Sequence, residues 1–289
     1  MDVTEVVDWF DRNARDLAWR APGTSGWGVL VSEIMLQQTP VARVEPIWLQ
    51  WMARWPLPSD LAAETQGEIV RAWGKLGYPR RALRLHSAAA VIAESHDDVV
   101  PADIDILLAL PGIGAYTARA VVAFAYGKRA PVVDTNVRRV VARAVHGAGD
   151  AGPPSTTRDM ADVEALLPED AGRAAVASAA LMELGAVLCT ARAPRCGDCP
   201  ILSTCAWHRA GRPAYAGPAK AVQRFAGTDR QVRGLLLDVL RGRTEPAAKA
   251  RLDIVWPDPT QRDRCLHSLL VDGLVEQTST GMFALPGEH

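Results

Sequence analysis

Four of the five cysteines lie in one short segment, and their spacing suits a metal centre. Cys189, Cys196, Cys199 and Cys205 are separated by six, two and five residues. Four thiolates on one loop can ligate a [4Fe–4S] cluster or a zinc ion. Zinc sites usually carry two CxxC pairs about a dozen or more residues apart, whereas this segment has one CxxC and a lone cysteine on each side. The spacing therefore favours the iron–sulphur cluster, with zinc as the alternative.

Two carboxylates have surroundings that suit opposite protonation states. Asp134 precedes a predicted helix, where its side chain would cap backbone N–H groups. The cap donors would fix its direction and keep it ionised, able to stabilise positive charge on a sugar. Glu33 lies among apolar residues, either exposed beside Gln37 or partly buried, and burial would raise its pKa and let it hold a proton. Such pairs are typical of glycoside hydrolysis; a plain helix cap is the alternative for Asp134.

A glycine-containing turn, Leu110–Gly114 (LPGIG), joins two predicted helices. Gly112 and Gly114 would let backbone N–H groups at a helix start approach a phosphate, because a side chain there would block the approach. A plain helical hairpin is the alternative. Basic residues also crowd the stretches 71–84 and 128–143, so a chain of net charge −1 could still follow a nucleic-acid backbone. Ordinary solvated helix faces would explain these two stretches equally well.

Together these motifs resemble the adenine DNA glycosylases (the MutY type) of the helix-hairpin-helix superfamily, over about residues 5–210. The resemblance rests on Ser32–Thr39 (SEIMLQQT), Gly77–Tyr78, Leu110–Gly114, Val133–Asn136 and the cysteine loop. It implies double-stranded DNA containing an adenine mismatch as the partner, and hydrolytic removal of adenine opposite 8-oxoguanine or guanine. It also implies that the adenine is flipped out, since the glycosidic bond is unreachable inside a duplex.

The resemblance gives each matching residue a role. Glu33 would protonate the flipped adenine and help activate water, Asp134 would stabilise the charged sugar, and Asn136 would steady Glu33 and the water. Tyr116 would line the base pocket. Endonuclease III-like enzymes carry a lysine nucleophile at this position, so this chain is expected to be monofunctional. The implied DNA contacts are Leu36, Gln38 and Thr39 at the opposite base, Tyr78 as a wedge in the stack, and Gly112 and Gly114 at the phosphates.

Two other functions fit part of the pattern. A thymine or uracil mismatch glycosylase shares the tyrosine and the aspartate, and only contacts in the base pocket separate it from an adenine enzyme. A non-catalytic iron–sulphur DNA-binding protein would need the cysteines but not the set of Glu33, Asp134 and Asn136. The presence of all three favours an enzyme.

The rarity of strand-like alternation predicts a mostly α fold. The resemblance implies two lobes, a six-helix barrel module with the hairpin and a lobe containing the cluster, with the active site in the cleft between them. The cluster is expected to be structural and to hold Arg192 and Arg195 against phosphates. Helices are predicted over residues 1–20, 29–38, 43–54, 60–64, 67–76, 80–95, 103–109, 115–126, 135–145, 158–167 and 171–187.

The expected domains are a glycosylase domain at residues 1–210 with the cluster loop at 189–205, a linker at 211–229, and a small winged-helix-like domain at 230–289. Some 60 residues are too few for the larger Nudix-like domain usual in the resembling family. This last domain either contacts DNA or serves only as a packing appendage. Its candidate DNA contacts are Arg230, Arg233, Arg241 and Arg243.

Composition limits the setting of the protein. No apolar run approaches the roughly 20 residues that a membrane span needs, so we expect no membrane partner. Five cysteines and no targeting segment indicate a cytoplasmic protein, nucleoid-associated and of bacterial type. We also expect a monomer, and a small buried hydrophobic role for Cys265, which lies outside the cluster segment.

Overall fold

The computed structural model describes residues 1–215, 217 and 225–288. These residues are mostly helical, as predicted, and the part described contains one two-stranded antiparallel sheet. They form two compact units. Unit 1 comprises the described residues of Met1–Val29, Ala102–Ala109 and Ile113–Ala219, and unit 2 comprises those of Leu30–Pro101, Leu110–Gly112 and Lys220–His289.

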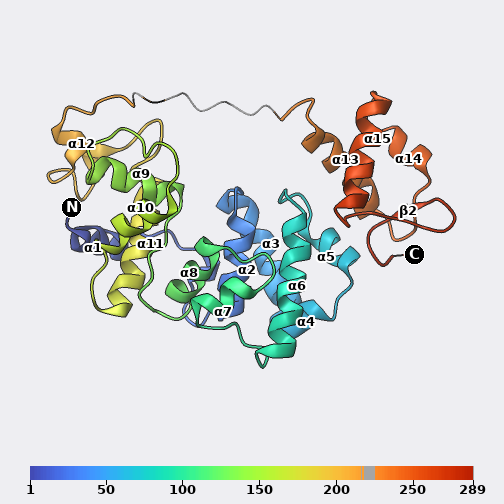
Figure 1. Cartoon of the computed structure of the whole chain (residues 1–289), viewed down its shortest axis with the longest axis horizontal. Helices are drawn as coiled ribbons and strands as arrows, with labels where there is room; N and C mark the ends of the chain where they lie inside the picture. The colour runs from blue at the N-terminus through green and yellow to red at the C-terminus, as the bar shows by residue number, and fades with distance from the viewer. Residues whose placement is uncertain (216, 218–224, 289) are drawn as a thin grey trace. The chain divides into compact units, whose positions relative to one another are not determined.

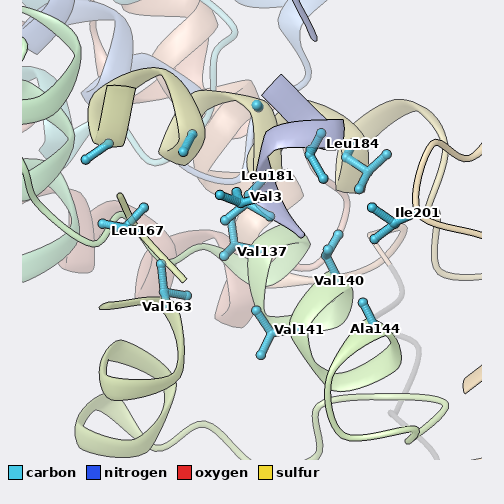
Figure 2. Packing of buried hydrophobic residues seen from close by; sticks show 14 of the residues in the cluster. Val3, Val137, Val140, Val141, Ala144, Val163, Leu167, Leu181, Leu184 and Ile201 are labelled. Atoms are coloured by element: carbon cyan, nitrogen blue, oxygen red, sulfur yellow. The ribbon is translucent and has the colours of Figure 1, made fainter. Parts of the chain in front are cut away.

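Unit 1 includes helices α1, α8, α9 and α11 (Figure 1), and it carries the predicted aspartate and the cysteine loop. Its centre is the long helix α11, which packs on α1, α8 and α9. Many alanines on α11 let these helices approach closely, and Leu181 and Leu184 fill one buried cluster with valines of α9 (Figure 2). The elements are α1 (Val3–Asn13), η1 (Ala18–Arg20), α7 (Ile104–Ala109), α8 (Ala115–Phe124), α9 (Thr135–Ala144), α10 (Thr156–Glu164), α11 (Ala171–Val187), η2 (Cys196–Asp198) and α12 (Ala206–Arg209).

The first helix is shorter than predicted. It ends at Asn13, whereas the sequence pattern predicted a helix to residue 20. The cause is Glu183 of α11, which is fully buried. Its carboxylate accepts the backbone N–H of Arg15 at 3.1 Å, two guanidinium bonds from Arg15 at 2.6 and 2.9 Å, and one from Arg20 at 3.0 Å. Because a longer helix would use the N–H of Arg15 for its own ladder, this tertiary ion cluster ends it.

We expect Glu183→Gln to lower the free energy of unfolding by about 2 to 3 kcal/mol near neutral pH, because both arginines lose a buried anionic partner. Burial raises the pKa of Glu183, but the bonds from Arg15 and the charge of Arg20 outweigh it, so the net shift is downward. The stabilisation is therefore present above the ordinary value of 4.5 and lost as pH falls below it. Urea unfolding at neutral and acidic pH measures both effects.

The control for this variant is Glu164→Gln, at a half-exposed carboxylate paired with Arg129. It should cost less than 1 kcal/mol, about the value of a surface pair. Equal stability losses in the two variants, or a loss at Glu183 that does not shrink in acid, would contradict this role for the buried carboxylate.

Unit 2 contains α2 (Gly26–Leu36) from Leu30 onward, and its core includes three edge-to-face tryptophans, Trp51, Trp55 and Trp73. The predicted helices are found here with ends shifted by three residues or fewer. The elements are α3 (Val41–Arg54), α4 (Pro58–Ala62), α5 (Gln66–Trp73), α6 (Arg80–Ser95), α13 (Asp229–Arg241), α14 (Lys249–Asp253), α15 (Pro259–Val271), β1 (Glu276–Gln277) and β2 (Phe283–Ala284).

The last elements, α13 to β2, form the predicted winged-helix-like arrangement. A short bridge between Ala247 and Phe283, with bonds of 2.7 and 2.9 Å, ties the segment after α13 to the hairpin. Cys265 is buried in the core of this segment, as predicted. Val70 of α5 belongs to the same buried cluster, and Arg71 bonds to Glu288 at 2.6 and 2.7 Å. The C-terminal elements therefore pack against α5.

The predicted linker at 211–229 is only partly covered, because residues 216 and 218–224 lie outside the described residues. Helix α13 begins at Asp229, beside the predicted domain start at 230. The predicted domain limits stay a prediction. Among the helices that the structure describes, none is long and apolar enough to cross a membrane.

Candidate active site

Helix α2 carries Glu33 in an apolar setting. The Ser25 hydroxyl accepts the Gly28 N–H at 3.1 Å where the helix begins. Residues on every side of the helix are apolar and buried, which is typical of a core helix. Glu33 itself is only 5% exposed. Of the two alternatives that the sequence left open, the structure therefore has the buried one.

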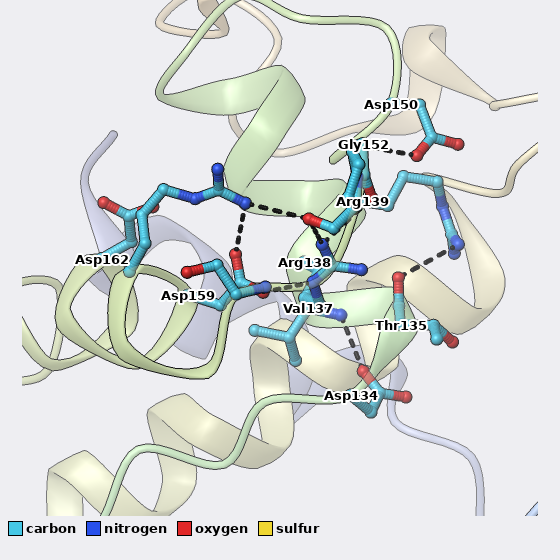
Figure 3. Close-up of polar contacts among 12 residues, drawn as sticks. Asp134, Thr135, Val137, Arg138, Arg139, Asp150, Gly152, Asp159 and Asp162 are labelled. Atoms are coloured by element: carbon cyan, nitrogen blue, oxygen red, sulfur yellow. Dashed lines mark hydrogen bonds and ion pairs between the residues drawn. The ribbon is translucent and has the colours of Figure 1, made fainter. Parts of the chain in front are cut away.

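Asp134 is the N-cap of α9 (Figure 3). Its Oδ1 accepts the backbone N–H groups of Asn136 and Val137 at 2.8 and 2.7 Å, and its Oδ2 accepts the Asn136 side-chain amide at 2.7 Å. The predicted fixing of its direction is confirmed. Burial, however, raises the pKa of Asp134 by more than these three bonds and the charge of Arg139 lower it, so the net shift is upward. The cap donors act in the predicted direction, and the expectation that they keep Asp134 ionised stays a prediction.

Asn136 connects this cap to the cysteine loop through Arg139. The Asn136 oxygen accepts a bond from Arg139 Nη2 at 2.7 Å. The same guanidinium donates from Nη2 to the Gly185 carbonyl at 2.7 Å and from Nε to the Cys189 carbonyl at 2.6 Å. Asn136 thus steadies Asp134 in this structure, and its predicted contact with Glu33 stays a prediction. The sequence analysis had placed Arg139 only in a basic stretch.

Gly185 explains how α9 and α11 come so close at this point. It lies inside α11, where glycine costs about 1 kcal/mol relative to alanine. A Cβ at this position would stand 2.8 Å from both the Cβ and the carbonyl oxygen of Asn136. The obstacle includes backbone, so it cannot rotate aside. The sequence signal that could have found it is a lone glycine in a strongly helical stretch.

We therefore expect Gly185→Ala to reduce the adenine excision that the sequence resemblance implies by about tenfold to a hundredfold, as a misplacement of about 1 Å does. The methyl group would push Asn136 away and disturb the carboxylate that it holds. Single-turnover excision measures the loss. Gly172→Ala, in the first turn of the same helix, is the control, because the nearest atom to its added Cβ is 3.5 Å away. Equal rates in the two variants would contradict the close-approach argument.

Glycine stands at each of the two hairpin positions, 112 and 114, for a different physical reason. Gly112 has φ +76°, and an added Cβ would lie 2.7 Å from Cβ of Arg84. Its glycine is thus required by backbone conformation and helix packing, whether or not a phosphate binds. Gly114 caps α8 with extended backbone, and an added Cβ would meet nothing within 4 Å. The open space at Gly114 suits the predicted approach of a phosphate, which stays a prediction at both glycines.

Tyr116 lies in the first turn of α8, half-buried. Its hydroxyl lies 3.9 Å from the sulfur of Met182 on α11, at the limit for a bond to sulfur. A phenol at this position cannot form a Schiff base with an aldehyde, whereas a lysine amine could.

Arg81 organises the predicted opposite-base loop after α2. Its Nη1 donates to the carbonyls of Ile34 (2.6 Å) and Met35 (3.2 Å) in the last turn of α2 and to that of Gln37 (2.7 Å) just beyond it. Its Nη2 donates to Thr39 Oγ1 at 3.1 Å. Burial, opposed only weakly by Tyr78, lowers the pKa of Arg81 to about 10. From the sequence, Arg81 could be placed only in a basic stretch, because only the fold brings its side chain to the end of α2.

The residues of this loop differ in exposure. Gln38 is exposed and has φ +56°, and Leu36 is half-buried. Thr39 is only 6% exposed, and its hydroxyl donates to the Leu76 carbonyl at 3.1 Å. Thr39 therefore anchors the loop from inside, while Gln38 is the outward-facing member. Contact of any of these side chains with the opposite base stays a prediction.

Most arginines of the two basic stretches bond to other groups of the protein. Arg129 bonds to Glu164, and Arg138 bonds to Asp159 at 2.6 Å (Figure 3). In the other stretch, Arg71 bonds to Glu288 and Arg80 pairs with Asp272 at 3.2 Å. Each of these four arginines therefore has a carboxylate partner in the fold, and contact of the two stretches with phosphates stays a prediction. Sequence shows that cations cluster but not which carboxylates the fold supplies.

The four cysteines of the loop line one pocket in unit 1, together with apolar side chains of α9 and α11 such as Val140 and Leu184. Within the described residues, no group of three or more His, Cys, Asp or Glu side chains is arranged to hold a single metal ion. Burial raises the pKa of Cys199 to about 11. An enclosed, apolar set of four thiols fits a group that takes them as thiolates and replaces their lost solvation.

Arg143 of α9 lines this pocket and is only 5% exposed. It donates to Cys189 Sγ at 3.4 Å and to the carbonyls of Thr190 at 2.8 Å and Ala191 at 3.1 Å. Its guanidinium also lies over the Trp207 ring, 4.7 Å from the centroid. Arg143 therefore fixes the start of the loop and places positive charge beside a ligand sulfur.

Comparisons with known proteins agree with these features. A family model described as "HhH-GPD superfamily base excision DNA repair protein" matches residues 31–163. The chain is 66% identical over 285 residues to an adenine DNA glycosylase of Mycolicibacterium smegmatis, an alignment that covers 98% of this chain and 96% of that protein. It is 61% identical over 286 residues to an adenine DNA glycosylase of Mycobacterium tuberculosis, covering 99% and 93%.

A solved structure of a thermostable thymine-DNA glycosylase matches with a TM-score of 0.65 and 26% identity. The match covers 72% of this chain and 95% of that one.

Proposed function

Since this chain belongs to the adenine DNA glycosylases of the HhH-GPD superfamily, we propose that it removes adenine opposite 8-oxoguanine or guanine by hydrolysis, without cutting the strand. It is a DNA N-glycosylase of base excision repair, and DNA is its substrate. The observation that carries the proposal is the contrast between Glu33, enclosed in an apolar helix, and Asp134, fixed at a helix start by three bonds. The enzyme acts as a monomer in the cytoplasm, at the nucleoid.

Glu33 acts as the general acid. Adenine is a poor leaving group until a ring nitrogen is protonated, and a carboxyl group in apolar surroundings holds its proton more readily than one in water. After the bond breaks, the same carboxylate accepts a proton from the attacking water. The burial of Glu33 supports this assignment.

Asp134 stabilises the sugar. As the glycosidic bond breaks, positive charge develops on the ring oxygen and the anomeric carbon, and a fixed carboxylate stabilises it without reorganising. Asn136 and the backbone of α9 hold that carboxylate in one direction. Arg139 in turn holds Asn136 and links it to the cysteine loop.

Tyr116 makes the enzyme monofunctional. Strand cleavage by related enzymes requires an amine that attacks the sugar, and a phenol cannot supply it. Water is therefore the nucleophile, and the product is an abasic site in an intact strand.

The four cysteines ligate a [4Fe–4S] cluster, which would supply four covalent ties that hold the loop in one conformation. Arg143 would then donate to the Cys189 thiolate. In this proposal the cluster is structural, and it holds the loop that anchors Arg139 through the Cys189 carbonyl.

Purified protein should contain about four irons and four acid-labile sulfides per chain. Cys199→Ser should lose most of this iron and melt at a lower temperature, while Cys265→Ser, at a buried cysteine outside the pocket, should keep the iron. Metal analysis and thermal melting measure both. Zinc in place of iron would contradict the cluster and favour the tetrahedral alternative.

The second candidate is removal of thymine or uracil opposite guanine, and the structural match to a thymine-DNA glycosylase is the observation that favours it. Single-turnover reactions on duplexes carrying A opposite 8-oxoguanine, A opposite G, T opposite G and U opposite G, with the released base identified, separate the two. Adenine alone should be released. Release of thymine or uracil would overturn the proposal.

A further inference from the structure

Two arginines of unit 2 lie close to the ring of Tyr78. The Arg81 guanidinium carbon lies 5.5 Å from the centre of the Tyr78 ring, and that of Arg230 lies 5.3 Å away. Both distances are within the range for cation–π attraction, about 6 Å. The ring is 40% exposed even so. An exposed aromatic side chain held at two points is placed to contact something outside the protein.

The backbone at Tyr78 is strained, and hydrogen bonds to the neighbouring residue hold it in place. Tyr78 has φ +48°, a left-handed conformation that costs an ordinary residue about 1 to 2 kcal/mol. The Gly77 carbonyl compensates by accepting bonds from Trp73 Nε1 at 2.9 Å and Arg81 Nη2 at 3.0 Å. The loop therefore presents the tyrosine in one preset direction.

Arg230 reaches this ring from the C-terminal segment. It lies in the first turn of α13, and ion pairs join this segment to the chain on either side of Tyr78: Lys75, in the turn after α5, pairs with Asp238 at 3.4 Å, and Arg80 of α6 pairs with Asp272 at 3.2 Å. The Arg71 guanidinium also donates to the Arg243 carbonyl at 2.9 Å. These contacts fix α13 against the tyrosine loop.

The other three arginines proposed as DNA contacts of this segment bond to groups of the protein itself. Arg233 pairs with Asp272 at 2.6 Å. Arg241 donates to the Val70 carbonyl at 3.1 Å and pairs with Asp238, and Arg243 donates to the Glu245 carbonyl at 3.4 Å. Of the four, Arg230 is the one that the structure sets against a residue predicted to enter DNA.

We propose that Arg230 is a positioning residue that holds the Tyr78 ring ready to enter the duplex beside the opposite base. This inference rests on the proposed function. It gives the short C-terminal segment a role in recognising the mismatch. The segment acts on the loop between α5 and α6, which carries Tyr78. Arg81 holds the ring from its own helix, and Arg230 couples it to α13.

The first test compares Arg230→Ala, Arg230→Lys and the control Arg251→Ala, which removes an exposed arginine of α14. Insertion is followed by the fluorescence of 2-aminopurine placed next to the mismatch, and excision by single-turnover rates. Arg230→Ala should slow insertion and excision by about twofold to fivefold, as loss of an exposed cation–π contact implies. Arg230→Lys should restore most of the loss, and the control should match the unchanged protein.

A second test separates positioning from a direct phosphate contact. In the background of Tyr78→Leu, Arg230→Ala should have no further effect, because the ring on which it acts is gone. Equal losses with and without the tyrosine, or no loss in Arg230→Ala, would overturn the inference. Failure of the unchanged protein to release adenine would instead overturn the proposed function, so the two failures are distinct.

Discussion

Glu33→Gln is expected to lower the single-turnover rate of adenine excision by about 10²- to 10⁴-fold, the range for loss of a general acid. Glutamine has nearly the same shape and accepts the same neighbours, but it has no proton to give at neutral pH. Glu33 lies among buried apolar residues of α2, so the neutral amide should be tolerated there. Affinity for the mismatched duplex should change by roughly twofold or less, because the interaction lost is made in the transition state.

The matched control is Glu94→Gln, the same change at an exposed glutamate of α6 in the same unit. It should leave excision unchanged. Gel-shift affinity and quenched excision on one duplex measure both properties. A Glu33→Gln protein that excises adenine at nearly the normal rate would remove Glu33 from the mechanism, and one that fails to bind would point to a structural role.

Asp134→Asn should slow excision by about 10²- to 10³-fold, the usual cost of losing one preorganised electrostatic group. The asparagine oxygen can still accept the N–H groups of Asn136 and Val137, so α9 keeps its cap and the protein should fold. What is lost is the negative charge that stabilises the sugar in the proposed mechanism. The control is Asp170→Asn, which changes the N-cap of α11, where Asp170 accepts the Arg173 N–H at 2.8 Å. It should be fully active.

The pH dependence of the excision rate of the unsubstituted enzyme tests the same role of Asp134. Asp134 must be ionised to act, and burial raises its pKa above the ordinary value of 3.8. Excision should therefore be lost on acidification at a higher pH than an ordinary aspartate would give. Asn136→Ala removes a bond that lowers this pKa, so it should move the acidic limb to still higher pH. An unmoved limb, or full activity in Asp134→Asn, would contradict the assignment.

The sequence predicted the helices well, because their apolar spacing and end signals are local. The glycines at 112 and 114, for example, marked the turn before α8. The helix at 1–20 was too long, because Glu183, 168 residues from Arg15, decides where the chain leaves the helix. No pattern near the N-terminus contains that information.

The residues of the candidate site could likewise be predicted only in part. Glu33, Asp134 and the cysteines could be identified from residue type and spacing, since each stands in a short motif. Arg139 and Arg81 could not, because their roles depend on carbonyls that helix ends and loops present only in the folded chain. The upward shift of the Asp134 pKa could not be predicted either, because burial is a property of the fold.

Adenine release from a duplex with A opposite 8-oxoguanine, measured in the presence of borohydride, tests hydrolysis without a covalent enzyme link most directly. The reaction should yield free adenine, a strand that breaks only after alkali, and no protein trapped on the DNA. Strand cleavage without alkali, or a trapped complex, would show an amine nucleophile elsewhere in the chain and contradict the role of water. An intact adenine would contradict the proposed function itself.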